Sequence, residues 1–374
     1  MNAPRPPGGR GARLARRLGL ALVCLVLFDL AAKALLDLRE RPAAAPAATP
    51  ASEPEPWRIP SPLYHHDLAP CASAMAVWGP ERYAFVTNSL GLRDGVPRQV
   101  ELAPRPRRRR TLVMGDSFAE GIGVPWSATF AGRLAGLAAA RGEELLDAGV
   151  CSYSPVIHRR KLAHLLERGL ELDRVVLLLD LSDPADELGY ALVDERVVSV
   201  EPPPPPGPPP GPGPVAAFLV RRTLLGAALW RGHRRLTVGS SRSLGAVALR
   251  TRQRSGWTED PALLAWVEPG VASCELHLAA LAALCRARGI ELTLVVYPAP
   301  AQLQARERDS LHVRRWREWC AREQVGFVDL FPLFLDAGAP ADTYRALFIA
   351  GDVHWNAEGH RVVAEALRPR LFGE

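Results

Sequence analysis

The chain has 374 residues, of which 48% are hydrophobic and 23% charged, a composition typical of one large globular domain or two smaller ones. The formal net charge of +6 comes largely from arginines clustered in the N-terminal tail and at residues 105–110. These clusters lack the interleaved aromatic residues that a nucleic-acid surface needs, so we expect no nucleic-acid partner. The six cysteines show no Cys-x-x-Cys pair, and we expect neither a metal nor a cofactor.

The N-terminus has the pattern of a membrane anchor. A basic tail, residues 1–17, precedes the apolar segment 18–38, which is long enough for a transmembrane helix. Asp29 and Lys33 interrupt this segment four residues apart and can pair on one helix face. The preceding arginines predict that the N-terminus stays inside and that the body lies outside the cytoplasm, in the periplasm or at the cell surface. A cleaved signal peptide is the alternative, and it places the body on the same side.

A Pro/Ala-rich linker, residues 39–60, separates this anchor from a predicted domain at 61–374. From Thr111 onward the pattern alternates between strand and helix, which indicates a flavodoxin-like α/β fold. We expect three αβα layers around a mostly parallel five-stranded sheet. The predicted strands are 111–114, 144–148, 175–180, 291–297 and 326–330. The predicted helices are 126–141, 155–168, 271–288, 306–323 and 356–369.

The interval 188–265 breaks this alternation. A proline and glycine insertion at 202–214 cannot enter a helix or a central strand and forms either a rigid spacer or a disordered loop. The segment 215–236 that follows is apolar and studded with arginines. It either covers the active-site edge as a helix, which we favour, or lies on a membrane surface.

The first candidate for chemistry is the run Met114-Gly115-Asp116-Ser117-Phe118, which directly follows a predicted strand. A tight turn at this point would expose the Ser117 hydroxyl at the carboxyl edge of the sheet, where open α/β folds place their active sites. In such turns an aspartate like Asp116 more often accepts hydrogen bonds from backbone amides.

The second candidate is Gly351-Asp352-Val353-His354 near the C-terminus. A serine hydroxyl needs a base within hydrogen-bond reach, and that base needs an orienting carboxylate. His354 is the predicted base for Ser117, and Asp352 is predicted to hold its tautomer. His360 lies inside the next predicted helix, where packing explains it better than catalysis.

Together these motifs resemble the SGNH, or GDSL, hydrolase superfamily. Residues 115–117 match its first block, which carries the nucleophile, and Asp352 and His354 match its last block. The short Asp-x-His spacing is similar to that of alginate O-acetylation proteins and related membrane-anchored envelope members. Further similar stretches are 87–94, 149–155 and 297–300, so that the resemblance covers roughly residues 62–374.

The resemblance also implies an oxyanion hole, but two of its blocks depart from the family pattern. The expected donors are the backbone N–H groups of Ser117 and Ser152, with Ser152 standing where the family has glycine. Ser182 stands where the family has an asparagine amide, and loss of one such donor costs ~10²–10³ in kcat. Nearby Asp180, Asp183, Asp186 and Glu187 make this strand edge acidic, which we interpret as a solvated, helix-capping loop in preference to a metal site.

The resemblance implies an exported serine esterase or O-acyltransferase. Its substrate would be a small ester or an acylated envelope polysaccharide or glycan, and a membrane-bound acyltransferase would be a partner. The alternative is a binding or assembly module with weak catalysis, which the serines at positions 152 and 182 favour. A flavodoxin-like nucleotide binder is disfavoured, because no glycine-rich cradle or Walker lysine follows the first strand.

Overall fold

The computed structural model of the chain describes residues 17, 24–25, 28–33, 55–79, 81–207, 222–226, 228 and 242–373. The chain divides into two compact units, one of residues 1–52 and 207–239 and the other of residues 53–206 and 240–374. The second unit contains every residue predicted for the active site. Of the predicted transmembrane helix at 18–38, only positions 24–25 and 28–33 are described, and these are helical.

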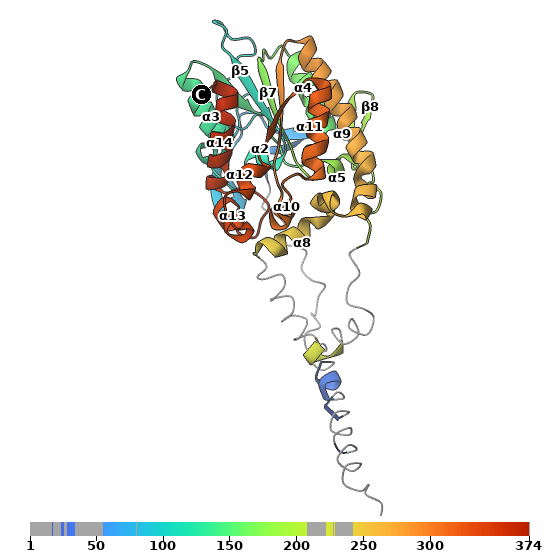
Figure 1. The fold of residues 1–374 in the computed structure, drawn as a ribbon. Coiled ribbons are helices and arrows are strands. Elements are labelled where there is room, and N and C mark those ends of the chain that lie inside the picture. The colour runs from blue at the N-terminus through green and yellow to red at the C-terminus, as the bar shows by residue number, and fades with distance from the viewer. Residues whose placement is uncertain are drawn as a thin grey trace, which may run out of the picture. The chain divides into compact units, whose positions relative to one another are not determined.

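The second unit is built on one five-stranded parallel sheet with the strand order β11-β10-β7-β5-β6 (Figure 1). This is the flavodoxin-like order, and it confirms the predicted fold class. The strands are β5 (Arg110–Met114), β6 (Glu144–Asp147), β7 (Arg174–Leu179), β10 (Glu291–Val296) and β11 (Gly326–Asp329). Each lies within one residue of a predicted strand, because β5 and β7 are buried throughout and read as continuous apolar runs.

Helices cover both faces of the sheet, as a doubly wound fold requires. α3 and α14 pack together on one face, and α4 and α9 pack together on the other, with α11 beside α9 (Figure 1). From β5 the chain adds β6 on one side and then crosses back to add β7 on the other side, so the strand order changes direction between β5 and β7. Doubly wound folds bind their ligands at such a switch point. The principal helices are α3 (Phe130–Ala140), α4 (Pro155–Glu167), α9 (Pro261–Ala287), α11 (Leu311–Glu323) and α14 (Ala357–Phe372).

Further elements surround the carboxyl edge of the sheet, and among them α2 and α8 line the site. The helices are α2 (Ser117–Glu120), α5 (Asp183–Glu187), α8 (Leu244–Ser255), α10 (Pro300–Ala305), α12 (Phe331–Leu335) and α13 (Pro340–Leu347), with short 3₁₀ turns at Trp126–Ala128 and Gly256–Thr258. Three antiparallel hairpins complete the unit: β1 (Arg58–Ser61) with β2 (His65–Leu68), β3 (Ser73–Trp78) with β4 (Glu81–Val86), and β8 (Tyr190–Val193) with β9 (Arg196–Ser199).

Helix α9 begins ten residues earlier than the sequence predicts, at Pro261 instead of residue 271. Pro269 and Gly270 read as a break, but the helix continues through them. Gly270 is needed for packing, because a Cβ there would lie 1.9 Å from the carbonyl oxygen of Pro184 in α5. Of the described helices, α9 alone is long and apolar enough to cross a membrane, but it packs against α4 and α5, which makes it a core helix of this unit.

The segment predicted to cover the active-site edge, 215–236, lies outside the described residues except for 222–226 and 228. These belong to the first unit, where the backbone N–H groups of Leu224 and Leu225 donate to the Asp29 carboxylate. Helix α8 lines the site instead. The sequence did not separate α8 from the irregular interval because its apolar stripe is short, with Leu244, Ala246, Val247 and Ala248 as its buried apolar residues.

Candidate active site

The turn after β5 places Ser117 at the edge of a cavity. Gly115 has φ 155°, and a Cβ on it would lie 2.7 Å from Ala119 Cβ and 3.0 Å from Leu178 Cβ, so the close approach of β7 requires glycine. Asp116 then caps α2 by accepting a 2.9 Å hydrogen bond from the Phe118 N–H, which confirms its predicted backbone role. The hydroxyl of Ser117, at the first position of α2, therefore points away from the sheet.

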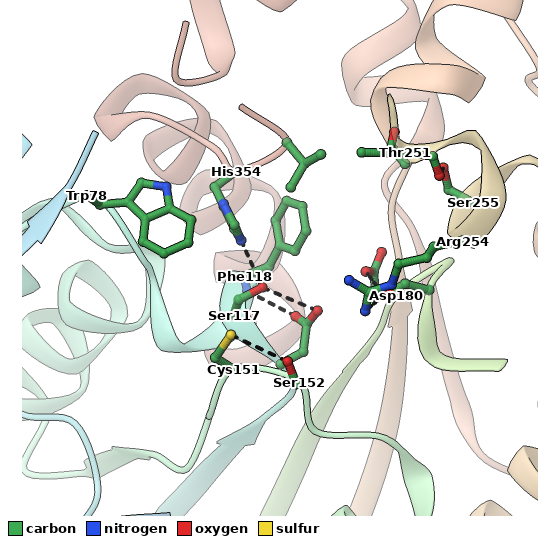
Figure 2. A pocket seen from close by; sticks show the side chains of 14 residues that line it. Trp78, Ser117, Phe118, Cys151, Ser152, Asp180, Thr251, Arg254, Ser255 and His354 are labelled. Atoms are coloured by element: carbon green, nitrogen blue, oxygen red, sulfur yellow. Dashed lines mark hydrogen bonds between the residues drawn. The ribbon is translucent and has the colours of Figure 1, made fainter. Parts of the chain in front are cut away.

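The structure brings the three predicted side chains together as one hydrogen-bonded chain. Figure 2 shows the part of this chain that joins His354 to Ser117. His354 Nε2 lies 2.9 Å from Ser117 Oγ, and His354 Nδ1 lies 2.6 Å from Asp352 Oδ1. An ionised carboxylate can only accept hydrogen bonds, so Nδ1 carries the proton and Nε2 is left free to accept the Ser117 O–H. The other contact of that hydroxyl, with Asp116 Oδ2, is longer at 3.5 Å.

The turn that carries Asp352 and His354 is held by residues that the sequence did not indicate. Trp78 Nε1 donates to Asp352 Oδ2 at 2.9 Å, and the Tyr344 hydroxyl donates to the Asp352 carbonyl at 2.8 Å. Burial alone would raise the pKa of Asp352, but the hydrogen bond and charge of His354 lower it to about 2. Asp352 therefore stays ionised at neutral pH and can orient the imidazole.

Ser117, Ser152 and Ser182 all line a cavity of about 200 Å³ at the carboxyl edge of the sheet. Ser152 adopts a left-handed backbone conformation with φ 64°, which is the conformation that the glycine of the family motif would favour. The Ser182 hydroxyl donates to Asp180 Oδ2 at 2.7 Å, so it would have to rotate to reach an oxyanion. The oxyanion roles of these three residues remain predictions.

The acidic strand edge is not the solvated loop that we expected. Asp180, Asp183 and Glu187 are buried, and α9 packs against α5, the helix that carries two of them. Arg254 of α8 forms an ion pair with Asp186 and donates to the Ser182 hydroxyl at 3.3 Å, which places a cation in the cavity (Figure 2). Among the described residues no group of three or more carboxylate, imidazole or thiol side chains has the geometry of a metal site.

Burial of these carboxyl groups has an electrostatic cost. Burial first, and the neighbouring Asp180 second, raise the pKa of Asp116 well above its ordinary value, while burial and Asp116 do the same for Asp183. Burial raises the pKa of Glu187 from 4.5 to about 7, although hydrogen bonds from the Val156 N–H and the Ser273 hydroxyl oppose the shift.

The raised pKa of Glu187 predicts a pH-dependent loss of stability. A carboxyl group with a raised pKa in the folded state stabilises the protein fully below pH 4.5, and its contribution disappears as the pH rises through about 7. In the wild type the free energy of unfolding should fall between pH 5 and pH 8. We expect this fall to be roughly 3 kcal/mol smaller in Glu187→Gln. Urea unfolding across that pH range measures the difference. Glu195→Gln is the control, because Glu195 is exposed. Parallel curves for wild type and Glu187→Gln would contradict the prediction.

Other candidate residues are structural. His360 is buried in α14, stacks on the Phe130 ring and accepts a 3.3 Å hydrogen bond from the Phe130 N–H, as the sequence predicted. Burial lowers the pKa of His360 to about 3, so it stays neutral. Cys274, Cys285 and Cys320 are buried free thiols.

A second, larger cavity of about 810 Å³ lies beside the first and shares Trp78 with it, while Asp352 forms part of its wall. It is lined by the β3–β4 hairpin, the loop after α2, helices α8 and α13, and the segment from Phe348 to the start of α14. Of these walls only the last carries a sequence motif, so the sequence did not indicate this cavity.

Comparison with known proteins gives structural likeness only. No protein-family model and no curated protein matches the sequence. The structure is similar to solved structures of TesA (16% identity, TM-score 0.40, covering 71% of this chain and 99% of that one) and of the psychrotrophic esterase EstA from Pseudoalteromonas sp. (11%, 0.38, 70% and 96%). It is also similar to the acetylxylan esterase Axe2 from Geobacillus stearothermophilus (13%, 0.38, 71% and 95%). At this level of similarity, the function of the chain has to be inferred from its own residues.

Proposed function

We propose that the chain is a serine-dependent carboxylic ester hydrolase or O-acyltransferase. The observation that carries this proposal is the hydrogen-bonded chain from Ser117 Oγ through His354 to Asp352, at 2.9 Å and 2.6 Å, on the wall of a cavity. A buried packing histidine would not need an ionised carboxylate on one ring nitrogen and, on the other, a hydroxyl that lines a cavity. That arrangement supports acyl transfer over a purely structural role.

The reaction follows from these contacts. Ser117 Oγ attacks the ester carbonyl carbon while its proton moves to His354 Nε2, and the carbonyl π bond becomes an oxyanion. Collapse of this intermediate breaks the bond to the alcohol, which leaves with the proton from Nε2. Water or a sugar hydroxyl then attacks the acyl-enzyme and gives its proton to the same nitrogen. Collapse of this second intermediate breaks the bond to Ser117 Oγ, which takes the proton back from Nε2, and the acid or the new ester is released.

The oxyanion would be stabilised by the backbone N–H groups of Ser117 and Ser152, two residues that line the same cavity. Rotation of the Ser182 hydroxyl would add a third donor. Arg254 offsets the negative charge of the neighbouring aspartates, which would otherwise oppose the developing oxyanion.

The second cavity supports a substrate larger than its acyl group. The acyl group would lie in the 200 Å³ cavity, and the remainder of the molecule would extend past Trp78 into the 810 Å³ cavity. The indole at this boundary provides a flat apolar surface of the kind that packs against a sugar ring. We therefore propose an acylated glycan as substrate.

From the sequence we further propose an anchor at residues 18–38 and a body outside the cytoplasm. A membrane-bound acyltransferase is the proposed acyl source.

Active-site labelling tests the proposal. The full-length chain in detergent is incubated with a fluorophosphonate probe and, separately, with p-nitrophenyl acetate. We expect stoichiometric labelling and ester hydrolysis by the wild type, and neither by Ser117→Ala. Faster release of nitrophenol on addition of oligosaccharide, with acylated sugar as product, would identify a transferase. A folded wild type that is neither labelled nor active would overturn the proposal in favour of the binding module.

A further inference from the structure

The turn at Cys151 and Ser152 forms one wall of the 200 Å³ cavity, opposite His354 (Figure 2). Ser152 has φ 64°, a conformation that costs an L-residue roughly 1 kcal/mol relative to glycine and persists only where its surroundings hold it. What holds this turn therefore determines the direction of the Ser152 N–H. The proposal below rests on the proposed function, in which that N–H binds the oxyanion.

The N-terminal side of the turn is fixed by a buried carboxylate. Glu120 Oε2 accepts a 2.6 Å hydrogen bond from the Cys151 N–H. The same carboxylate forms a bidentate ion pair with Arg58 of β1, in which two guanidinium nitrogens lie 2.7 Å and 3.0 Å from the two carboxylate oxygens. Glu120 is 1% exposed, so this arrangement is shielded from solvent.

The Cys151 carbonyl is held by His66 of β2, whose Nε2 lies 2.8 Å from the oxygen. A carbonyl oxygen can only accept, so Nε2 carries the proton and Nδ1 of the neutral ring is an acceptor. His65 Nδ1, at 2.7 Å, must then donate to His66 Nδ1, and His65 Nε2 lies 2.7 Å from the Ser199 hydroxyl. Burial lowers the pKa of His66, which agrees with a neutral ring.

This contact acts directly on the predicted oxyanion donor. The carbonyl of Cys151 and the N–H of Ser152 belong to the same peptide group, which is planar and points them in opposite directions. A hydrogen bond that fixes the oxygen therefore fixes the N–H as well, and it also polarises the peptide so that the N–H becomes a better donor.

We propose that His66 is a positioning residue that aims the Ser152 N–H at the oxyanion. It acts through the Cys151 carbonyl and does not touch the substrate. Its own backbone is fixed in turn, because the Tyr153 hydroxyl donates to the His66 carbonyl at 2.7 Å. The β1–β2 hairpin is in this way part of the catalytic apparatus, although it lies about fifty residues before Ser117 in sequence.

Two substitutions that differ by one methylene group test this role. In His66→Gln the amide nitrogen occupies the place of Nε2 and can still donate to Cys151. In His66→Asn the shorter amide reaches only the place of Nδ1 and loses that bond. We expect His66→Asn to lower kcat for p-nitrophenyl acetate by ~10–10²-fold with KM within about threefold, since a misaimed donor costs less than a deleted one. We expect His66→Gln to stay within about fivefold of wild type.

His164→Leu is the matched control, because His164 lies on α4 beside the Tyr64 ring, and we expect its kcat to be unchanged. Thermal unfolding of all variants separates positioning from folding. Overlapping kcat values for wild type, His66→Gln and His66→Asn would overturn the inference while leaving the proposed function intact. An equal loss of kcat in His66→Gln and His66→Asn would also overturn the inference. A wild type that is neither labelled by fluorophosphonate nor active would overturn the proposed function first.

Discussion

Replacing His354 with alanine should lower kcat/KM for p-nitrophenyl acetate on the order of 10⁴-fold or more. Without the imidazole, no described group within hydrogen-bond distance of Ser117 Oγ other than Asp116, at 3.5 Å, can take the proton. Asp116 is a poor substitute, because its contact with Ser117 Oγ is long and its other carboxyl oxygen already caps α2. Serine nucleophiles lose activity on this scale when their base is removed.

The comparison variants for this prediction are in the same part of the chain. His360→Gln keeps an acceptor for the Phe130 N–H and should leave kcat within a few fold of wild type. Asp352→Asn keeps the size of the side chain but removes the acceptor that fixes the His354 tautomer, and we expect a loss on the order of 10³–10⁴-fold. Steady-state kinetics with active-site titration measures all three variants. Retention of more than a tenth of wild-type activity by His354→Ala would contradict the assigned roles.

The sequence was sufficient to predict the sheet, because its signal is local. Each parallel strand is an apolar run bounded by a turn, and β5 and β7 are buried along their whole lengths. The sequence was also sufficient to predict that Ser117, Asp352 and His354 lie together. The motifs put each residue at the end of a strand or the start of a helix, and the doubly wound fold brings those ends to one edge of the sheet. The turn chemistry of Gly115 and Asp116 then places the Ser117 hydroxyl, while Trp78 and Tyr344, which the sequence did not indicate, hold the turn of Asp352 and His354.

What the sequence could not provide depends on packing between distant segments. Asp180 and Asp183 have the local pattern of a solvated helix-capping loop. They are buried in the structure, where α9, which begins more than seventy residues later, packs against α5. The ion pair between Arg254 and Asp186 could not be predicted from the sequence, because it depends on where α8 lies in the fold. Trp78 and His66 lie in short hairpins without a periodic pattern, and their partners, Asp352 and Cys151, are 274 and 85 residues away.

Pro269 and Gly270 illustrate a different limit. Read locally, the pair marks a helix end, and a helix starting at residue 271 is the reasonable prediction. The structure continues the helix because Gly270 allows the backbone of α9 to approach Pro184, at a distance that any side chain would prevent. The gain from that close packing outweighs the one backbone hydrogen bond that Pro269 cannot make.

Replacing Lys161 with methionine should destabilise the protein by about 3–5 kcal/mol, the largest effect on stability that we expect from a single substitution. Lys161 of α4 is fully buried, and its Nζ lies 2.7 Å from Asp67 Oδ1 and 3.5 Å from the Ala148 carbonyl. Asp67 also accepts from the Tyr64 hydroxyl at 2.7 Å. Methionine fills a similar volume but leaves a buried carboxylate without its cation, and chemical denaturation at pH 7 measures the loss.

The second substitution in a double-mutant cycle distinguishes loss of charge pairing from loss of packing. Adding Asp67→Asn to Lys161→Met removes the unpaired charge and should recover part of the lost stability, with a coupling free energy of roughly 1–3 kcal/mol. Arg168→Met, at the exposed end of the same helix, should change stability by less than about 0.5 kcal/mol. Because this pair joins α4 to the β1–β2 hairpin that carries His66, the single variant should also lose kcat before it unfolds. Additive effects of the two substitutions would show that the buried pair does not connect these elements energetically.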